Sequence, residues 1–309
     1  CGQNSFEASG ASNLFKDLLK DKELKIFKKK SSYPELSELK QIIISLKDFS
    51  PDLILAVGGG SVLDYAKTAN VLTESRNLES EISASNYKIK KKFTKLAAIP
   101  TTAGSGAEVT SNAVIYIDKV KYSVEGEFLK PDFFFLIPEL VMTGSNKIKS
   151  SAGFDAIAQA IESLISKKSN DKSVNFAEKS LKISFKYYLD YLNKPTIENT
   201  SAMCQAANLS GEAISISKTT APHAVSYPFT SIYGISHGHA VSLTLNKFLR
   251  FNYSNLKNSK CNFDLKKRFE MMFNTANLKD IESFDKFIEN LKKKANLENR
   301  FKSLGIDIE

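Results

Sequence analysis

Cysteine is scarce in this sequence, and long apolar runs are missing from it. The three cysteines, Cys1, Cys204 and Cys261, are far apart among 309 residues. Isolated thiols form neither a disulfide framework nor a paired-cysteine metal site, and they are typical of a reducing compartment. No apolar run is long enough to cross a bilayer, and no signal-peptide pattern is present. We therefore expect a soluble, cytoplasmic protein with no membrane partner.

Acidic residues are fewer than basic ones, which gives a net charge of +9. A basic patch for nucleic acid would explain this excess, and so would a lysine-rich surface. The lysines are scattered, with short runs at 28–30, 90–92 and 292–294, and no aromatic side chains are interleaved with them. We favour the lysine-rich surface and expect no nucleic-acid partner. The positive field would still attract an anionic substrate or a phosphorylated cofactor.

Strand and helix patterns alternate in the first half of the chain. The apolar run Leu53–Val57 is typical of a buried parallel strand. Further strands are expected at 95–99, 112–117 and 133–137, a hairpin strand at 121–124, and amphipathic helices at 12–20 and 34–47. This alternation of strands and helices predicts an α/β domain over residues 1–146 with a doubly wound parallel sheet. Cys1–Ser5 resembles a strand end entering a loop, so we expect the strand itself to lie outside the chain.

The second half of the chain, residues 147–309, has helical periodicity without strand patterns. Helices are expected over 151–166, 171–193, 197–216, 238–251, 262–275 and 281–294. The stretch Met142–Ser150, with its Gly, Ser and Asn residues, marks the boundary between the halves. The second half is therefore predicted to be an all-helical domain.

Two glycine-containing loops follow predicted strands. Gly58–Ser61 joins a strand to a helix, where backbone N–H groups and the helix N-terminus favour a phosphate. A tight turn without a ligand is the alternative, because the loop is neither GxGxxG nor GxxxxGK[ST]. Pro100–Glu108 combines hydroxyls with glycines, which suits ribose and phosphate contacts. Two such loops at the carboxyl ends of parallel strands predict a nucleotide-type ligand there.

The only histidines, His223, His237 and His239, lie in one short segment. Asp155 and Gln159 are four residues apart on a predicted helix and share a face. A carboxylate buried on that face needs a partner, and a cation is a natural one. An Asp155/His223/His237 set would leave a coordination position open for water or a substrate oxygen. The alternative is that Asp155 caps its helix and His239 is exposed.

Four motifs, in matching order and spacing, resemble the iron-containing (group III) alcohol dehydrogenase family. Gly58–Lys67 is similar to its GGGSxxDxAK loop, Pro100–Thr110 to PTTAGTGSEVT, Gly153–Glu162 to GxDALxHAIE and Tyr233–Ala240 to GxPHGxA. The resemblance spans nearly the whole chain. It implies a dehydroquinate synthase-like fold, with a dinucleotide-binding domain before the all-helical one. Chains of this family usually extend further at both ends, so we expect part of the helical domain to lie outside this sequence.

The resemblance also implies roles for single residues. Asp155, His223 and His237 would bind the metal, and the two histidines would thereby take part in catalysis. The cofactor would be held by Gly59, Gly60, Ser61, Asp64, Thr101, Thr102, Ser105, Asn112 and Lys121. Gln159 departs from the family because its iron enzymes have His there. An amide oxygen is a weaker ligand, which resembles the zinc-dependent glycerol dehydrogenases and leaves Fe²⁺ and Zn²⁺ both open.

A narrower resemblance concerns the substrate. Ser217–Pro228, with Gln159 and His237–His239, is similar to phosphonoacetaldehyde reductases and implies phosphonate metabolism. Lys218 and Thr219 would bind an anionic phosphonate, with His239 as a further substrate residue, unless they only begin a helix.

Two further positions bear on the proton path and the cofactor. Tyr227 stands where several members have a His thought to relay protons, so the relay would use Tyr227 or water. Gly2 stands where NAD enzymes of the family often have Asp, which favours NADPH over NADH.

The sequence therefore predicts a metal-dependent NAD(P)H oxidoreductase that reduces an aldehyde to a primary alcohol, acting as a homodimer. Reduction of phosphonoacetaldehyde to 2-hydroxyethylphosphonate is the narrower hypothesis. Three alternatives stay open: a glycerol dehydrogenase-like polyol or other alcohol dehydrogenase, a dehydroquinate synthase-like lyase, and a degenerate binding protein without catalysis.

Overall fold

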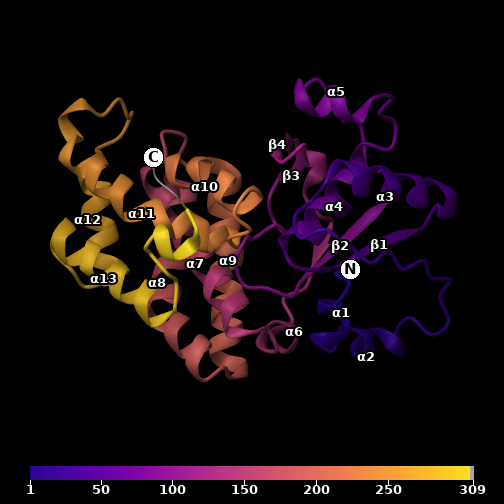
Figure 1. Ribbon diagram of the computed structural model, residues 1–309, viewed down its shortest axis with the longest axis horizontal. Helices are drawn as coiled ribbons and strands as arrows, with labels where there is room; N and C mark the ends of the chain where they lie inside the picture. The colour runs from indigo at the N-terminus through magenta and orange to yellow at the C-terminus, as the bar shows by residue number, and fades with distance from the viewer. Residues whose placement is uncertain (307–309) are drawn as a thin grey trace. The chain divides into compact units, whose positions relative to one another are not determined.

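The computed structural model describes residues 1–306, and these form two compact units (Figure 1). The first unit holds Cys1–Thr102 and Ala107–Gly144, and the second begins at Ser145 and includes Ala103–Gly106. The first is an α/β unit with a parallel sheet, and the second is helical, so the predicted fold class is confirmed.

The parallel sheet of the first unit has the strand order β1-β2-β5 within the described residues. Its strands are β1 (Leu53–Gly58), β2 (Lys95–Pro100) and β5 (Phe133–Phe134), with Val57 opposite Ile99. Val57 and Ile99 pack on residues of α2 (Ala11–Lys16) and α6 (Pro138–Met142). Ala56 and Ala98 pack on α4 (Gly60–Val71). Alternate side chains thus bury both faces of the sheet, as expected for a doubly wound domain.

The predicted hairpin is confirmed, and one strand prediction needs correction. Asn112–Ile117 is a strand, β3, and it pairs antiparallel with β4 (Val120–Glu125), which contains the hairpin strand expected at 121–124, in a ribbon separate from the parallel sheet. Asp118 and Lys119 both have positive φ, the backbone that a tight two-residue hairpin turn requires. The strand predicted over 133–137 is shorter, because Pro138 begins α6 and Ile137 caps that helix.

Two helices of the first unit cover this ribbon and the outer side of α4, namely α3 (Leu36–Phe49) and α5 (Leu78–Ser83). The short α1 (Ser5–Ala8) instead packs beside α2 on the parallel sheet, where Phe6 joins Val57 and Ile99. One apolar cluster joins α3, α4 and α5 to the inward side chains of β3 and β4. This packing fixes α4, and with it the loop from which α4 begins.

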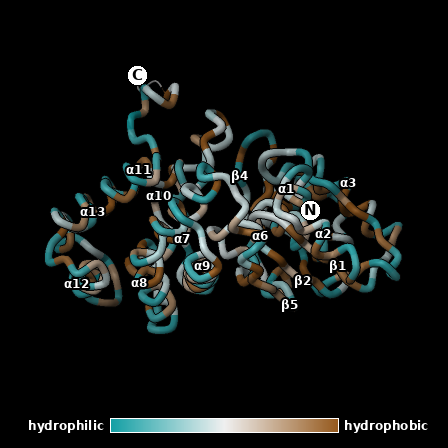
Figure 2. The backbone as a smooth tube through the Cα atoms, turned by 90° about the horizontal axis from the view of Figure 1, so that it is seen from below, coloured by the Kyte–Doolittle hydropathy of each residue, from teal (hydrophilic) through white to brown (hydrophobic). Residues whose placement is uncertain are grey.

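The second unit is built around α7 (Asn146–Ile165), which is buried along nearly its whole length from Lys149 onward. It packs against α8 (Asp171–Asn193), α9 (Ile197–Ser217), α11 (His237–Ser254) and α12 (Leu265–Thr275). Its buried residues include polar side chains as well as apolar ones, among them Asp155, Gln159 and Glu162. The helices around it, including α13 (Ile281–Lys294), alternate apolar and polar stretches (Figure 2). Over residues 1–306, no helix has the length and apolar character that crossing a bilayer requires.

One helix of the second unit was not predicted. Residues Ala221–Ser231 form α10, although Pro228 lies inside it. Proline lacks the N–H that an interior helical position donates, which weakens the helical pattern in the sequence. Pro222, in the first turn, is compatible with a helix start. As a result His223 occupies the first turn of α10, where its ring is buried.

Candidate metal and cofactor sites

Asp155, His223 and His237 come together in the second unit. They are placed by α7, α10 and α11, and each offers a ligand atom within 4.8 Å of the others. The Nε2 atoms of His223 and His237 lie 3.2 Å and 3.9 Å from Oδ1 of Asp155. Asp155 and His223 are buried, while about a third of the His237 side chain is exposed. The cluster therefore has one side open to a small molecule.

The donor set fits a divalent cation. Tetrahedral bonds of about 2.0–2.2 Å place neighbouring ligand atoms about 3.3–3.6 Å apart, comparable with the 3.2 Å and 3.9 Å that separate the histidines from Asp155. Two neutral imidazoles and a carboxylate suit Zn²⁺ and Fe²⁺, and three protein ligands leave a position for water or substrate. Asp155, His223 and His237 are thus the residues that would hold the ion.

Glu162 is a site residue that the sequence reasoning missed. Its carboxylate is fully buried, and one oxygen contacts Nδ1 of His223 on the side of the ring away from Asp155. Glu162 follows Asp155 by seven residues, so helical spacing could have placed it on the same face of α7. Metal-binding histidines commonly donate their second N–H to such a carboxylate.

The electrostatics around His223 favour positive charge. Burial of its ring lowers the pKa, but the charge of Glu162 and the hydrogen bonds to Asp155 and Glu162 outweigh burial and raise the pKa of His223 to about 9. Two buried carboxylates on one helix face need a cation nearby. A divalent ion bound to neutral imidazoles would balance both charges.

Gln159 is hydrogen-bonded on both sides of its amide. Its Nε2 donates to Oδ2 of Asp155 at 3.2 Å and to the backbone carbonyl of Ser105 at 3.4 Å. Its Oε1 accepts from the Ser210 hydroxyl at 3.0 Å. The amide nitrogen thus faces Asp155, and the oxygen that could bind a metal is held by Ser210. Ser105, predicted to line the cofactor site, belongs to the second unit here and supports Gln159.

Tyr227 packs its ring on His237, with centroids 6.2 Å apart and an interplanar angle of 25°. Burial, reinforced by the charge of Glu162, raises the pKa of Tyr227 to about 12 despite a hydrogen bond with Thr219. Its phenol is therefore neutral at physiological pH.

Lys218 follows the end of α9 and precedes Thr219, the residue that is hydrogen-bonded to Tyr227. Its backbone has φ 60° and ψ 172°, a combination that residues with a side chain rarely adopt. The predicted substrate residues Lys218 and Thr219 thus directly precede the helix that supplies His223.

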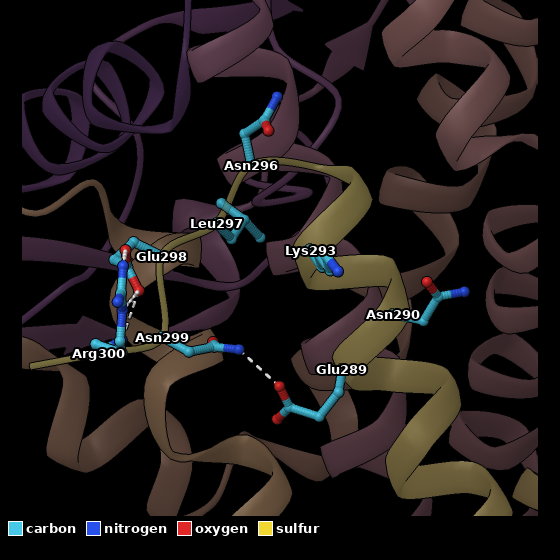
Figure 3. Close-up of a pocket in the computed structure, with 8 residues that line it drawn as sticks. All are labelled: Glu289, Asn290, Lys293, Asn296, Leu297, Glu298, Asn299 and Arg300. Carbon is cyan, nitrogen blue, oxygen red and sulfur yellow. Dashed lines mark hydrogen bonds and ion pairs between the residues drawn. The ribbon is translucent and has the colours of Figure 1, made fainter.

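His239 is not part of the ligand cluster. Its ring Nε2 is 2.8 Å from the backbone carbonyl of Glu298, and its backbone N–H donates to the Ser151 hydroxyl. Glu298 lines a separate polar hollow of about 680 Å³, in which it pairs with Arg300 (Figure 3). His239 thus has a structural partner in the helical unit, and its predicted role with substrate stays untested.

The first predicted cofactor loop and the start of the second lie side by side in the first unit, whereas Ala103–Gly106 of the second loop belongs to the second unit. The Thr101 N–H donates to the carbonyl of Gly58 at 3.0 Å, and Thr102 lies against Gly59. A Cβ on Gly58 would approach Val62 to 2.5 Å, so the turn from β1 into α4 is open only to glycine. In the described residues no side chain caps α4, which leaves its first N–H groups for an anion.

Lys67 ties the second loop to α4. Its ammonium is fully buried and donates to the carbonyls of Ala107 and Asn112 and to the Thr110 hydroxyl. Lys67 lies too deep in α4 to reach a phosphate bound at the start of that helix. Its role is instead to hold the part of the second loop that follows Gly106.

Asp64 is partly buried one turn before Lys67. Burial raises its pKa to about 6, against the opposing effects of Lys67, the Val114 N–H and Lys121. Lys121 and Asn112, both predicted cofactor residues, lie on the β3–β4 ribbon. The structure therefore brings Asp64 and Lys121 close enough for their charges to interact, within the unit that carries the Gly58–Ser61 loop.

Comparison with known proteins agrees with both units. The sequence model of iron-containing alcohol dehydrogenases matches residues 1–138, and that of the C-terminal region of the Fe-containing alcohol dehydrogenase family matches residues 149–309. The chain belongs to the iron-containing alcohol dehydrogenase family. The resemblance inferred from the four motifs is thereby confirmed.

Two curated relatives are similar over much of the chain. A phosphonoacetaldehyde reductase from Streptomyces viridochromogenes is 31% identical over 219 residues, which cover 68% of this chain and 55% of the relative. The 1-propanol dehydrogenase PduQ of Citrobacter freundii is 32% identical over 235 residues, covering 75% and 60%. The matched segments thus span only 55–60% of the length of these relatives.

A solved structure extends the match to nearly all of the chain. The sulfoacetaldehyde reductase of Bifidobacterium kashiwanohense, crystallised in complex with NAD⁺, superimposes with a TM-score of 0.86 and 28% sequence identity. The match covers 98% of this chain and 79% of that one.

Proposed function

We propose that this chain carries the cofactor-binding and metal-binding parts of an NAD(P)H-dependent aldehyde reductase whose substrate is a small anionic aldehyde. The observation that carries the proposal is the Asp155/His223/His237 cluster with its open side. When bound there, Fe²⁺ or Zn²⁺ supplies Lewis-acid polarisation of a carbonyl oxygen. A nicotinamide supplies the hydride. The chain's own residues hold the cation, bind the cofactor phosphates and orient the substrate.

The anionic group of the substrate is inferred from Lys218 and Thr219. A lysine and a hydroxyl before the first turn of α10 offer charge-assisted hydrogen bonds to a phosphonate or sulfonate. The phosphonoacetaldehyde and sulfoacetaldehyde reductases, whose substrates are acidic two-carbon aldehydes, support this choice. The 1-propanol dehydrogenase, at similar identity, favours a neutral alcohol as the second candidate.

An aldehyde panel tests the proposed function. We expect NADPH oxidation with phosphonoacetaldehyde or sulfoacetaldehyde to show a kcat/KM at least about tenfold above that with propanal, since a charged hydrogen bond contributes about 1.5–3 kcal/mol. Lys218→Gln should remove most of this difference and leave the propanal rate unchanged. A preference for propanal in the unaltered protein would overturn the anionic-substrate proposal. Absence of NADPH consumption with every aldehyde would favour a lyase or a non-catalytic protein.

The cofactor preference is a second arm of the same assay. We propose NADPH over NADH because Gly2 offers no carboxylate that would repel a 2′-phosphate. The related sulfoacetaldehyde reductase was crystallised with NAD⁺, so the alternative has direct support in a relative. A kcat/KM that is higher with NADH than with NADPH would reverse this assignment.

Tyr227 is proposed to deliver the proton that completes the reduction. Its ring lies on His237, and its raised pKa keeps the phenol protonated at neutral pH. Because general acid catalysis contributes about 10²–10⁴-fold, we expect Tyr227→Phe to lower kcat by at least about 100-fold. The affinity for the metal ion should stay unchanged, since no ligand atom is lost. An unaltered kcat would assign the proton to water.

A further inference from the structure

Glu162 contacts two parts of the candidate site at once. Its Oε1 contacts Nδ1 of the metal ligand His223, and its Oε2 accepts from both the N–H and the hydroxyl of Thr220, at 2.5 Å and 2.7 Å. The carboxylate is fully buried. A carboxylate offers about four acceptor positions, and three are used here. One oxygen therefore fixes a metal ligand, and the other fixes the residue that ends the substrate segment.

The segment held by Glu162 is under backbone strain at Lys218. Residues with side chains rarely adopt φ 60° with ψ 172°, and such strain persists only where the surroundings hold it. The Lys218 N–H donates to the Ile214 carbonyl, and the Ser217 hydroxyl is bonded to the Lys218 carbonyl and to Ser163. Ser166 donates to the Ser217 carbonyl.

The end of α7 thus supplies three of the side chains that clamp the Lys218–Thr220 segment, with Ser166 at its C-cap. Ser163 and Ser166 hold the side of Lys218 that faces α9, and Glu162 holds the side that faces α10 through Thr220. No step of the proposed reaction requires Glu162 to touch substrate or cofactor.

We propose that Glu162 is a positioning residue that sets the cation affinity of His223 and, through Thr220, holds the Lys218–Thr220 segment in place. The effect on cation affinity rests on the metal site of the proposed function. The effect on the Lys218–Thr220 segment bears on catalysis only if the substrate is the anionic aldehyde of that proposal. Removing the charge of Glu162, as in Glu162→Gln, leaves one acceptor oxygen where there were two. The amide NH₂ then faces either Nδ1 of His223 or the two donors of Thr220, and in both orientations the negative charge beside the ring is lost.

Metal affinity, measured by chelator competition with Zn²⁺ and without substrate, tests the first half. Loss of a carboxylate that supports a metal-bound histidine typically lowers affinity about 10–100-fold, and we expect this for Glu162→Gln. Glu178→Gln, the same chemical change at a partly exposed residue of α8, should bind Zn²⁺ as the unaltered protein does. A Glu162→Gln protein that is folded by circular dichroism and binds Zn²⁺ within twofold of the unaltered protein would overturn the proposal.

Thr220→Val separates the two halves, because it removes one donor to Oε2 and leaves the contact with His223. We expect unchanged Zn²⁺ affinity, faster hydrogen exchange at the Thr220 position and neighbouring amides, and a KM for the anionic aldehyde raised at least about fivefold. Unchanged hydrogen exchange would refute the clamp whatever the substrate proves to be. If Glu162→Gln does not fold, Glu162→Asp, which retains the charge but withdraws it from the ring, should still weaken Zn²⁺ binding, and unchanged affinity there would also refute the proposal.

Discussion

His237→Ala protein is expected to lose Zn²⁺ or Fe²⁺ binding by at least about 100-fold and aldehyde reduction by about 10³-fold or more. His237 supplies one of the three ligand atoms and lies at the open side of the cluster. Lewis-acid stabilisation by a bound metal is worth several kcal/mol, and each 1.36 kcal/mol corresponds to about tenfold in rate. Metal content after dialysis and NADPH oxidation with excess metal measure the two effects separately.

His239→Ala is the matched control for metal content. It removes an imidazole two residues further along the same helix, and that imidazole contacts the Glu298 carbonyl rather than the cluster. The control should retain the metal of the unaltered protein. If His237→Ala kept its metal and its turnover while remaining folded, the ligand assignment would be wrong. If both histidine variants lost the metal, the effect would come from α11 as a whole.

Much of the fold follows from local sequence patterns. Leu53–Val57 and Lys95–Ile99 are short apolar runs, and both form central parallel strands. The long helices of the second half begin at polar caps such as Asn170 and Thr196, where local chemistry determines the boundary. Strand partners were harder to predict, because apolar residues in β3 suit an antiparallel ribbon as well as a central parallel strand.

The clustering of Asp155, His223 and His237 was predictable from the sequence, and the residues that support this cluster were less so. Asp155, His223 and His237 could be named because histidine is rare and the motifs match a known family. Glu162 was missed because a glutamate in a helical pattern is ordinary until its burial is known. The Gln159 amide could bind a metal in principle, but its partners Ser210 and Ser105 are distant in sequence, so only the structure shows that its oxygen is occupied.

Gly238→Ala is expected to destabilise the protein and to weaken metal binding together. Gly238 is the second residue of α11, and a Cβ there would lie 2.0 Å from the Ser151 carbonyl oxygen and 2.8 Å from Cβ of Asp155. Both obstacles belong to α7, a buried helix that cannot give way locally. The start of α11 must therefore move, and His237 moves with it, away from Asp155.

The sign of the stability change makes Gly238→Ala informative. Alanine is normally favoured over glycine within a helix by about 1 kcal/mol, so the substitution would stabilise a helix that had room for it. Overpacking of this kind costs about 1–3 kcal/mol or more, so we expect a net loss in the free energy of unfolding measured in urea. Chelator competition should show at least about tenfold weaker Zn²⁺ binding in the same protein.

Gly234→Ala provides the control, because Gly234 precedes His237 by three residues and has open space around its Cβ position. Its positive φ predicts a loss of about 1 kcal/mol from backbone strain, with metal affinity unchanged. A Gly238→Ala protein with unaltered stability and Zn²⁺ affinity would show that α11 does not need this close contact with α7. Equal effects of the two substitutions on Zn²⁺ affinity would instead assign the sensitivity to the turn before α11. A metal defect confined to Gly238→Ala would mean that the approach of two helix backbones, rather than the ligands alone, sets the separation between His237 and Asp155.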